Sequence, residues 1–308
     1  TGVSQASPGC PLPAHRCDGR RYLRVMPELP EVETVRAQLE PLVRGAVVTD
    51  ARAHRSPKFA SAPEAIGSVI TGIDRRSKYL LFGLADAAAE QSDPGPNPGQ
   101  VHADRELIVH LGMTGALHVD DAPPHDPYER ASWHLADGRT LWFRDIRRFG
   151  RIAVVRAGDH QSLPTLHHLG PEPFDPLLDG IRFHRSLSAS RQRIKTQLLS
   201  QRPIAGVGNI YADEALWRAE IHPAVRRVGP GRADLLLGHI RDVLAEALDH
   251  GGTTLRDYRT PDRSTGRNQF RLDCYGRSGQ PCRRCATPLT SRELDQRTAT
   301  WCPACQAH

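Results

Sequence analysis

Residues 26–45 read MPELPEVETVRAQLEPLVRG, and patterned sequence begins with this stretch. Its apolar residues recur at intervals of three, four and three positions, which predicts one helix with a face formed by Val32, Val35, Leu39 and Leu42. Acidic residues and prolines crowd the front of the series, where both suit the first turn of a helix. Gly45 follows the series, and we expect the helix to end there.

The 25 residues before this stretch are rich in Pro, Gly and Arg and follow neither the helical nor the strand period. We expect residues 1–25 to be a disordered leader that is absent from the native mature protein, with Met26 as the initiator. Removal of Met26 would expose Pro27 as an N-terminal secondary amine, with Glu28 beside it. Because an α-amino group titrates at about pH 8, part of it is nucleophilic at neutral pH and condenses with an aldehyde-type carbon to an iminium. Within a peptide bond the same nitrogen is an unreactive amide, and the stretch is then simply a first helix.

The composition limits the class of protein. The chain has 308 residues with 39% hydrophobic content, enough for about two domains with ordinary cores. A net charge of +6 favours a polyanionic partner. The apolar runs are far shorter than the ~20 residues of a membrane-spanning helix, and the first 25 residues lack the apolar core of a signal peptide. We therefore exclude membrane insertion and expect a monomer in the cytoplasm, associated with the nucleoid.

The chain divides into a β-rich part and a helical part. Short β-rich runs separated by turn signals predict a β-sandwich or barrel, which we assign to residues 27–157. The interval 85–106 interrupts two of these strands and predicts a long surface loop. A Pro-rich passage over residues 158–180 predicts a linker. The helical part follows over residues 181–262, with its clearest helices at 191–199, 209–218 and 233–248.

Residues 263–308 form a third unit, which is rich in Arg, Cys and Gly. It contains two C-x-x-C pairs, formed by Cys282, Cys285, Cys302 and Cys305. Two such pairs close a tetrahedral thiolate site when the segment between them forms a hairpin. This spacing indicates zinc in a reducing compartment rather than disulfides. Because four protein ligands fill the coordination shell, we predict one structural Zn²⁺.

Three turns suit nucleic-acid binding. The segment GVGNIYA (206–212) joins two predicted helices with Asn209 at a plausible N-cap, and backbone N–H groups at a helix start bind phosphate. A tight turn between helices explains this segment nearly as well. The turns HLGMTG (110–115) and RRFG (147–150) carry a Met, an Arg and a Phe, which could enter a base stack as wedges. Taken singly, such Met and Phe residues are more often part of a core.

Together these motifs resemble the formamidopyrimidine-DNA glycosylases, a family of bifunctional base-excision repair enzymes. The match runs from Met26 to the C-terminus. Its anchors, in chain order, are MPELPEVETVR (26–36), RRSKYLLF (75–82), LIVHLGMTG (107–115), RDIRRFGR (144–151), LGPEPF (169–174), GVGNIYADEALW (206–217) and the cysteine pairs. Leu29 favours this branch, because the related endonuclease VIII branch usually has Gly there.

The resemblance implies an α+β multidomain fold. It has an N-terminal β-sandwich over residues 27–157 and a helix-two-turns-helix domain over residues 181–262. The lesion loop and a zinc-finger β-hairpin follow over residues 263–308, and DNA binds in the cleft between the domains.

The resemblance also implies residue roles. Pro27 is the nucleophile that attacks the deoxyribose C1′, and Glu28 is the acid/base that assists sugar opening. Lys78 contacts the phosphate backbone and assists lesion processing. The residues that fill the gap left by the everted nucleotide are Met113, Arg147 and Phe149, with Arg147 facing the orphaned cytosine. The phosphate-binding residues are Lys195, Asn209 and Arg297.

The implied activity is excision of oxidised purines from duplex DNA, chiefly 8-oxoguanine opposite cytosine and formamidopyrimidines. Strand scission follows by β- and δ-elimination, and abasic sites are also bound. Two departures from the family pattern concern Ile146, which replaces the usual Pro, and residues 260–274, which match poorly. A non-catalytic damaged-DNA-binding protein is the alternative if residues 1–25 remain attached. A zinc-ribbon transcription factor would explain the cysteines and the charge, but neither the Pro-Glu start nor the Met113 and Arg147 turns.

Overall fold

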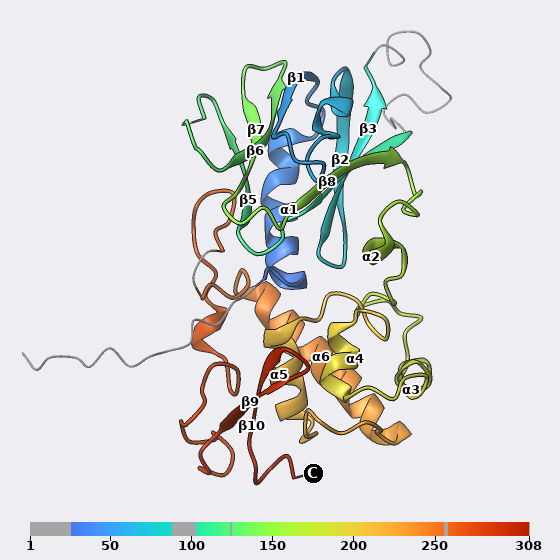
Figure 1. The fold of residues 1–308 in the computed structure, drawn as a ribbon, viewed down its shortest axis with the longest axis vertical. Coiled ribbons are helices and arrows are strands. Elements are labelled where there is room, and N and C mark those ends of the chain that lie inside the picture. Colours follow the sequence, from blue (N-terminus) through green and yellow to red (C-terminus); the bar gives the residue numbers. More distant parts are fainter. Residues whose placement is uncertain (1–25, 88–102, 124, 256–257, 308) are drawn as a thin grey trace, which may run out of the picture.

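The computed structural model describes residues 26–87, 103–123, 125–255 and 258–307. The predicted leader, residues 1–25, lies outside the described residues, and so does most of the predicted 85–106 loop. A β-rich half and a helical half follow one another along the long axis of the molecule (Figure 1). Among the described residues, no helix combines the length and the apolar character that a membrane crossing requires.

The β-rich half is a sandwich of two four-stranded antiparallel sheets, as the sequence predicted. One sheet has the order β1-β6-β7-β5 and the other β2-β3-β4-β8. The strands are β1 (Val48–Ala53), β2 (Ser68–Arg76), β3 (Tyr79–Asp86), β4 (Arg105–His110), β5 (Gly115–Asp120), β6 (Glu129–Leu135), β7 (Thr140–Asp145) and β8 (Arg151–Arg156), with a 3₁₀ turn, η1, at Ala62–Ala65. The buried core between the sheets contains Phe82, Trp133 and Phe143.

Helix α1 (Leu29–Val43) packs on this sandwich with a slightly different face from the one predicted. Val43 is fully buried, whereas Leu42 is 40% exposed. The prediction for Leu42 was wrong because the steps from Val32 are three, four and four residues, which keep closer to 3.6 per turn. The helix ends before Gly45, whose φ of +80° lies in the left-handed region.

A short helix, α2 (Pro164–His167), lies within the predicted linker and packs on the sandwich beside Tyr79 and Ile108. The helices of the helical half are α3 (Gly180–Ser188), α4 (Ile194–Leu199), α5 (Asn209–Arg218) and α6 (Pro230–Asp249), with a 3₁₀ turn, η3, at Asn268–Phe270. The predicted bounds of α5 are confirmed. Helix α4 begins three residues later than predicted, because Arg193 is extended and acts as its N-cap. The last unit is the hairpin β9 (Thr290–Leu294) and β10 (Arg297–Trp301), which packs beside α5.

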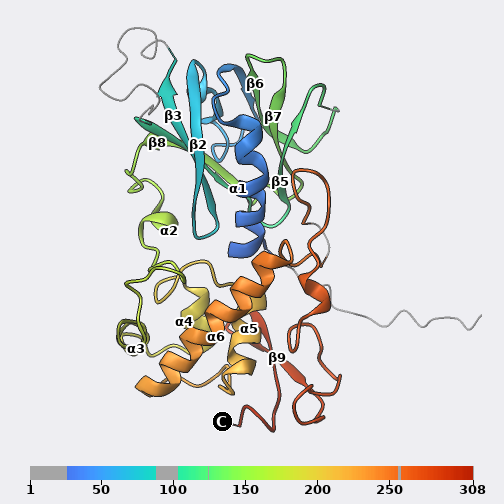
Figure 2. The same cartoon turned by 180° about the vertical axis from the view of Figure 1, so that it is seen from behind.

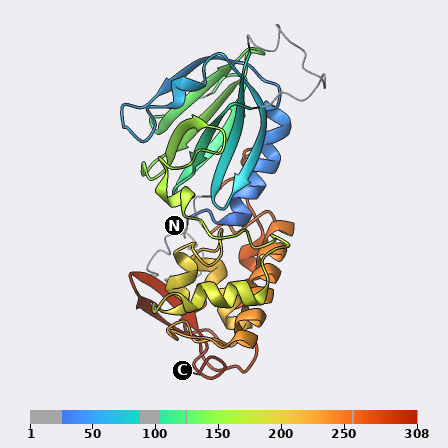
Figure 3. The same ribbon diagram turned by 90° about the vertical axis from the view of Figure 1, so that its right-hand side faces the viewer.

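Helix α1 joins the two halves. Its later apolar residues belong to the sandwich core, but Leu29 belongs to the helical core with Ile210 and Leu244. The first turn of α1 approaches the end of α6, and both helices lie on one side of the molecule (Figures 2 and 3). The residues just before α1 therefore lie where sandwich and helices meet.

Candidate active site

The start of α1 is fixed by the start of α5. Pro27 is buried, and Glu28 is only 2% exposed. The Glu28 carboxylate accepts hydrogen bonds from the backbone N–H of Gly208 (2.6 Å) and of Ile210 (2.9 Å). A residue that begins the sandwich helix therefore caps a helix of the other half.

This contact corrects the prediction for the GVGNIYA turn. The N-cap of α5 is Gly208, not Asn209, and the phosphate site expected at this helix start is occupied by the protein's own Glu28 carboxylate. Local sequence could not reveal this partner, because it lies 180 residues away from Gly208. Asn209 is the first helical residue, and its Oδ1 is buried without a hydrogen-bond partner among the described residues.

Burial raises the pKa of Glu28 to about 7. The charge of Lys78 and the two backbone N–H groups act in the opposite direction, while the nearby Glu31 carboxylate adds to the rise. A carboxyl group with this pKa is partly protonated at neutral pH. It can therefore give a proton in one step and take one in another.

Lys78 lies in the tight turn between β2 and β3, and its side chain reaches the same site. Its Nζ donates to the carbonyl of Val207 at 3.3 Å. Burial lowers the pKa of Lys78, and the positive charge of Arg297 lowers it further, whereas Glu28 acts against this shift. The structure thus brings together groups from the sandwich, the start of α5 and the β9–β10 hairpin.

The two arginines near Lys78 in the sequence are both paired with one carboxylate. Arg75 and Arg76 each form an ion pair of 2.7 Å with Glu172. The backbone N–H of Ser77 also donates to Glu172 at 2.7 Å. The LGPEPF motif therefore anchors the β2–β3 turn, and with it Lys78, to the segment that leads into the helical half.

Sequence analysis did not identify His110, which lies at the start of the Met113 turn. Burial and the charge of Lys78 lower the pKa of His110 to about 4. Its Nδ1 accepts a hydrogen bond of 3.2 Å from the N–H of Gly112, so the ring is neutral at physiological pH. Only its place in the LIVHLGMTG motif could have indicated it.

The structure brings the three predicted wedge residues together on two neighbouring turns. Arg147 Nη1 lies 3.3 Å from the sulfur of Met113. The Arg147 guanidinium also lies over the ring of Phe149, 4.5 Å from its centroid. Phe149 is 48% exposed, so the group is presented at the surface.

The hairpin places Arg297 at the surface, at the start of β10. The turn before it has positive φ at Asp295 (47°) and Gln296 (64°), as a two-residue hairpin turn requires. Arg193, next to α4, forms a 2.6 Å ion pair with Asp295. Arg297 is therefore carried by a hairpin that is fixed to the helical half.

Lys195 is an internal anchor of the same hairpin. It is 1% exposed, forms a 2.6 Å ion pair with Asp213 and donates to the carbonyl of Thr298 at 2.6 Å. In this structure the ammonium group is paired within the protein, and the phosphate contact expected of Lys195 stays a prediction. The resemblance matched the position, but not whether the side chain reaches the surface.

Two further buried carboxylates were not identified from the sequence: Glu31 contacts α5, and Glu214 lies on it. Glu31 accepts hydrogen bonds of 2.6 Å from the Tyr211 hydroxyl and from the N–H of Thr253. Glu214 accepts bonds from the N–H groups of residues 273–275. Through them α5 connects the start of α1 to the segment that leads into the cysteine pairs.

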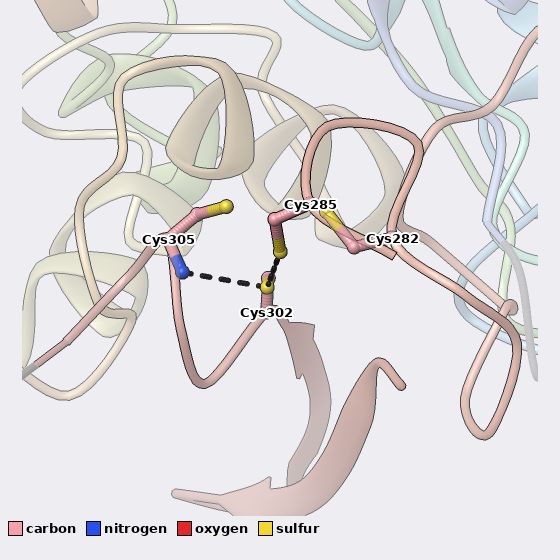
Figure 4. Close-up of side chains that lie close together, drawn as sticks. All are labelled: Cys282, Cys285, Cys302 and Cys305. Atoms are coloured by element: carbon pink, nitrogen blue, oxygen red, sulfur yellow. Dashed lines mark hydrogen bonds between the residues drawn. The ribbon is translucent and has the colours of Figure 1, made fainter. Parts of the chain in front are cut away.

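The four predicted cysteines form a single cluster. Their sulfur atoms all lie within 4.8 Å of one another, and Figure 4 shows them converging from two turns. Backbone N–H groups of Arg284 and Cys305 point at sulfur atoms, and the indole N–H of Trp217 lies 3.4 Å from the sulfur of Cys282. Four thiolates with such donors fit one structural zinc ion, with no open position for a substrate.

Replacing Cys282 with serine should abolish zinc binding and lower affinity for duplex DNA by about tenfold or more. The hairpin that presents Arg297 would lose its support, and a charge-assisted phosphate contact contributes roughly 1.5–3 kcal/mol. Metal analysis and a titration with labelled duplex measure both effects. Cys274→Ser is the matched control, because Cys274 is buried but outside the cluster. Unchanged DNA affinity in the zinc-free Cys282→Ser protein would show that the finger is dispensable for binding.

Comparison with protein families gives three matches in chain order. They are the formamidopyrimidine-DNA glycosylase N-terminal domain over residues 26–152, the formamidopyrimidine-DNA glycosylase H2TH domain over residues 169–259, and a zinc finger found in FPG and IleRS over residues 279–307. The three matches cover the sandwich, the helical half and the cysteine cluster.

Individual relatives match over most of the chain. A formamidopyrimidine-DNA glycosylase of Deinococcus radiodurans is 43% identical over 286 residues, which cover 91% of this chain and 97% of the relative. The crystal structure of the MutM (FPG) protein from Thermus thermophilus has a TM-score of 0.81 at 41% identity and covers 92% of this chain and 99% of its own. A Lactococcus lactis FPG mutant in complex with a Fapy-dG containing DNA has a TM-score of 0.78 at 33% identity, covering 92% and 100%.

Proposed function

The chain belongs to the formamidopyrimidine-DNA glycosylase family, and on this premise we propose that it is a bifunctional DNA glycosylase and AP lyase for oxidised purines. Its substrates are 8-oxoguanine opposite cytosine, formamidopyrimidines and abasic sites in duplex DNA. The observation that carries the proposal is the position of Glu28. A buried carboxyl group with a pKa of about 7 adjoins Pro27 and interacts with Lys78. The protein acts as a monomer on chromosomal DNA in the cytoplasm.

The first step is extrusion of the damaged nucleotide, because its C1′ cannot be reached inside the duplex. Extrusion costs a few kcal/mol of stacking and pairing. Met113, Arg147 and Phe149 offset this cost by entering the gap. The Arg147 guanidinium, which donates hydrogen bonds only, faces the acceptor edge of the orphaned cytosine.

The second step is displacement of the base by a free Pro27 amine. A bond forms between the Pro27 nitrogen and C1′, and the bond from C1′ to the base breaks, with its electron pair leaving on the base. The Pro27 nitrogen then loses its proton, which the departing base anion takes. Glu28 gives a proton to O4′ as the C1′–O4′ bond opens, and an iminium joins Pro27 to the sugar. The raised pKa of Glu28 keeps a protonated fraction available for this transfer.

Strand scission follows from the electron demand of the iminium. Loss of a proton from C2′ expels the 3′ phosphate, and loss of a second proton, from C4′, expels the 5′ phosphate. Addition of water to the remaining iminium releases the sugar fragment as an aldehyde and frees the Pro27 amine. Lys78 and Arg297 contribute positive charge toward the phosphates, and Asn209 contributes a polar side chain at the start of α5. Zinc, when held by the four cysteines, supports the hairpin and supplies no reaction chemistry.

The direct test uses a chain that begins at Pro27 and a duplex with one 8-oxoguanine opposite cytosine. We expect cleavage at the lesion that leaves phosphate on both ends of a one-nucleotide gap, and no cleavage of the same duplex with guanine. Cleavage is read on a denaturing gel and the ends by mass. Tight, lesion-selective binding without any cleavage would overturn the proposal and favour the damaged-DNA-binding alternative.

A further inference from the structure

The two turns that carry the wedge residues meet at one buried carboxylate, that of Asp145 at the end of β7. Asp145 is 0% exposed. Its Oδ1 accepts hydrogen bonds from the Thr114 hydroxyl at 2.6 Å and from the N–H of Arg147 at 3.2 Å. Its Oδ2 accepts one from the N–H of Gly150 at 2.7 Å. Both oxygen atoms are thus used to join the Met113 turn to the Arg147 turn.

Asp145 itself is held in place by the neighbouring strand. Its backbone N–H donates to the carbonyl of Tyr128 at 2.9 Å. Its backbone carbonyl accepts a hydrogen bond of 2.8 Å from Arg130, whose side chain is also buried. The carboxylate is therefore attached to the sheet, whereas the turns that it joins lie beyond the sheet.

The turns fit together without spare room. A Cβ on Gly112 would lie 2.5 Å from the backbone nitrogen of Gly150, so the backbones touch directly. Arg148, between two wedge residues, has a φ of 56°, a left-handed conformation that costs free energy for any residue except glycine. Such a conformation persists only when its surroundings hold it. The contacts of Asp145 on either side of Arg148 supply that restraint.

We propose that Asp145 is a positioning residue that holds Met113, Arg147 and Phe149 in one arrangement before DNA binds. It touches neither the reacting atoms nor the DNA. It acts by removing the entropy cost of assembling the wedge during nucleotide extrusion. The inference rests on the proposed function of these three residues and adds the group that assembles them.

The test removes the Thr114 hydroxyl at nearly constant side-chain shape. This deletes its hydrogen bond to Asp145 and the 3.1 Å hydrogen bond that it accepts from the N–H of Arg147. In Thr114→Val, single-turnover excision of 8-oxoguanine opposite cytosine should fall by about tenfold, the effect of losing one buried hydrogen bond to a charged group. Opposite an abasic position, where no base pair has to be broken, the loss should be less than about twofold. Asp145→Asn should show the same dependence on context with a larger loss. Thr140→Val is the matched control, because its buried hydroxyl pairs with His134 in the same sheet.

A second readout separates this inference from the proposed chemistry. A 2-aminopurine in the opposite strand reports by its fluorescence whether side chains have entered the stack, with or without cleavage. We expect wedge insertion by the unchanged protein and weaker insertion by Thr114→Val. The inference would be overturned if Thr114→Val lost excision equally opposite cytosine and opposite an abasic position. Unchanged wedge insertion in Thr114→Val would also overturn it. Insertion by the unchanged protein without excision would instead count against the proposed reaction.

Discussion

Replacing Glu28 with glutamine should lower the rate of base excision by roughly 10²–10⁴-fold, the usual effect of removing a general acid. Glutamine has nearly the same shape but has no proton to give to O4′. Its amide also has only one oxygen, so it cannot accept from both Gly208 and Ile210 as the carboxylate does. Lesion binding should change little, because Glu28 is buried and contacts protein. Single-turnover excision and a binding titration on the same duplex measure the two effects separately.

Glu214→Gln is the matched control for this variant. Glu214 is also buried, also accepts from backbone N–H groups, and has a pKa that burial raises to about 7. It lies toward the cysteine pairs and does not contact Pro27. A comparable loss of thermal stability in both variants, with excision lost only in Glu28→Gln, would assign the effect to chemistry. Full excision activity in Glu28→Gln would overturn the acid/base role.

The dependence of the excision rate on pH, compared between the unchanged protein and Glu28→Gln, shows whether Glu28 gives or takes the proton. Because burial raises the pKa of Glu28 to about 7, its protonated form predominates below that pH and falls tenfold for each pH unit above it. If Glu28 supplies the proton for sugar opening, single-turnover excision should decrease above about pH 7. This decrease should disappear in Glu28→Gln.

Local sequence patterns were sufficient to predict those features that depend on residues close together in the chain. The bounds of α5, the alternating strands of the sandwich and the spacing of the cysteine pairs all belong to this class. Leu42 shows that even a local pattern can be misread. A shift of one residue in the helical repeat decides whether Leu42 or Val43 is buried, and the structure buries Val43. The resemblance to a family supplied residue roles that no pattern in one sequence could give.

Partners distant in the chain could not be predicted. Lys195 matched a phosphate-binding position, but its charge is satisfied by Asp213, which lies on another helix. The α5 start has the composition of an anion site, and its anion is Glu28 of the same chain. The role proposed for Asp145 could not be predicted, because nothing in the local sequence shows that its carboxylate joins two turns. In each case the residue type allows several roles, and a tertiary contact determines which of these roles the side chain has.

A chain that begins at Pro27 should form a covalent adduct with 8-oxoguanine duplex in the presence of borohydride, and the 308-residue chain with residues 1–25 attached should form none above background. The reason is the state of one nitrogen atom. As a free secondary amine, Pro27 has an available lone pair at neutral pH, since an α-amino group titrates at about pH 8. In a peptide bond that lone pair is delocalised into the carbonyl group. Borohydride reduces the iminium to a stable amine, so the adduct is read directly on a denaturing gel.

Lys78 is a second amine that could attack the sugar and be trapped by borohydride. The experiment therefore has to distinguish an adduct on Lys78 from one on Pro27. Burial lowers the pKa of Lys78, which increases its neutral, nucleophilic fraction, and it interacts electrostatically with Glu28 in the same site. Equal adducts from both chains, with residues 1–25 intact by mass, would therefore assign the attack to Lys78. In the Pro27 form, Lys78→Arg should keep the adduct, whereas Pro27→Gly should weaken it, because a primary amine replaces the secondary one. Peptide mapping of the trapped adduct then identifies which of the two nitrogens carries the sugar.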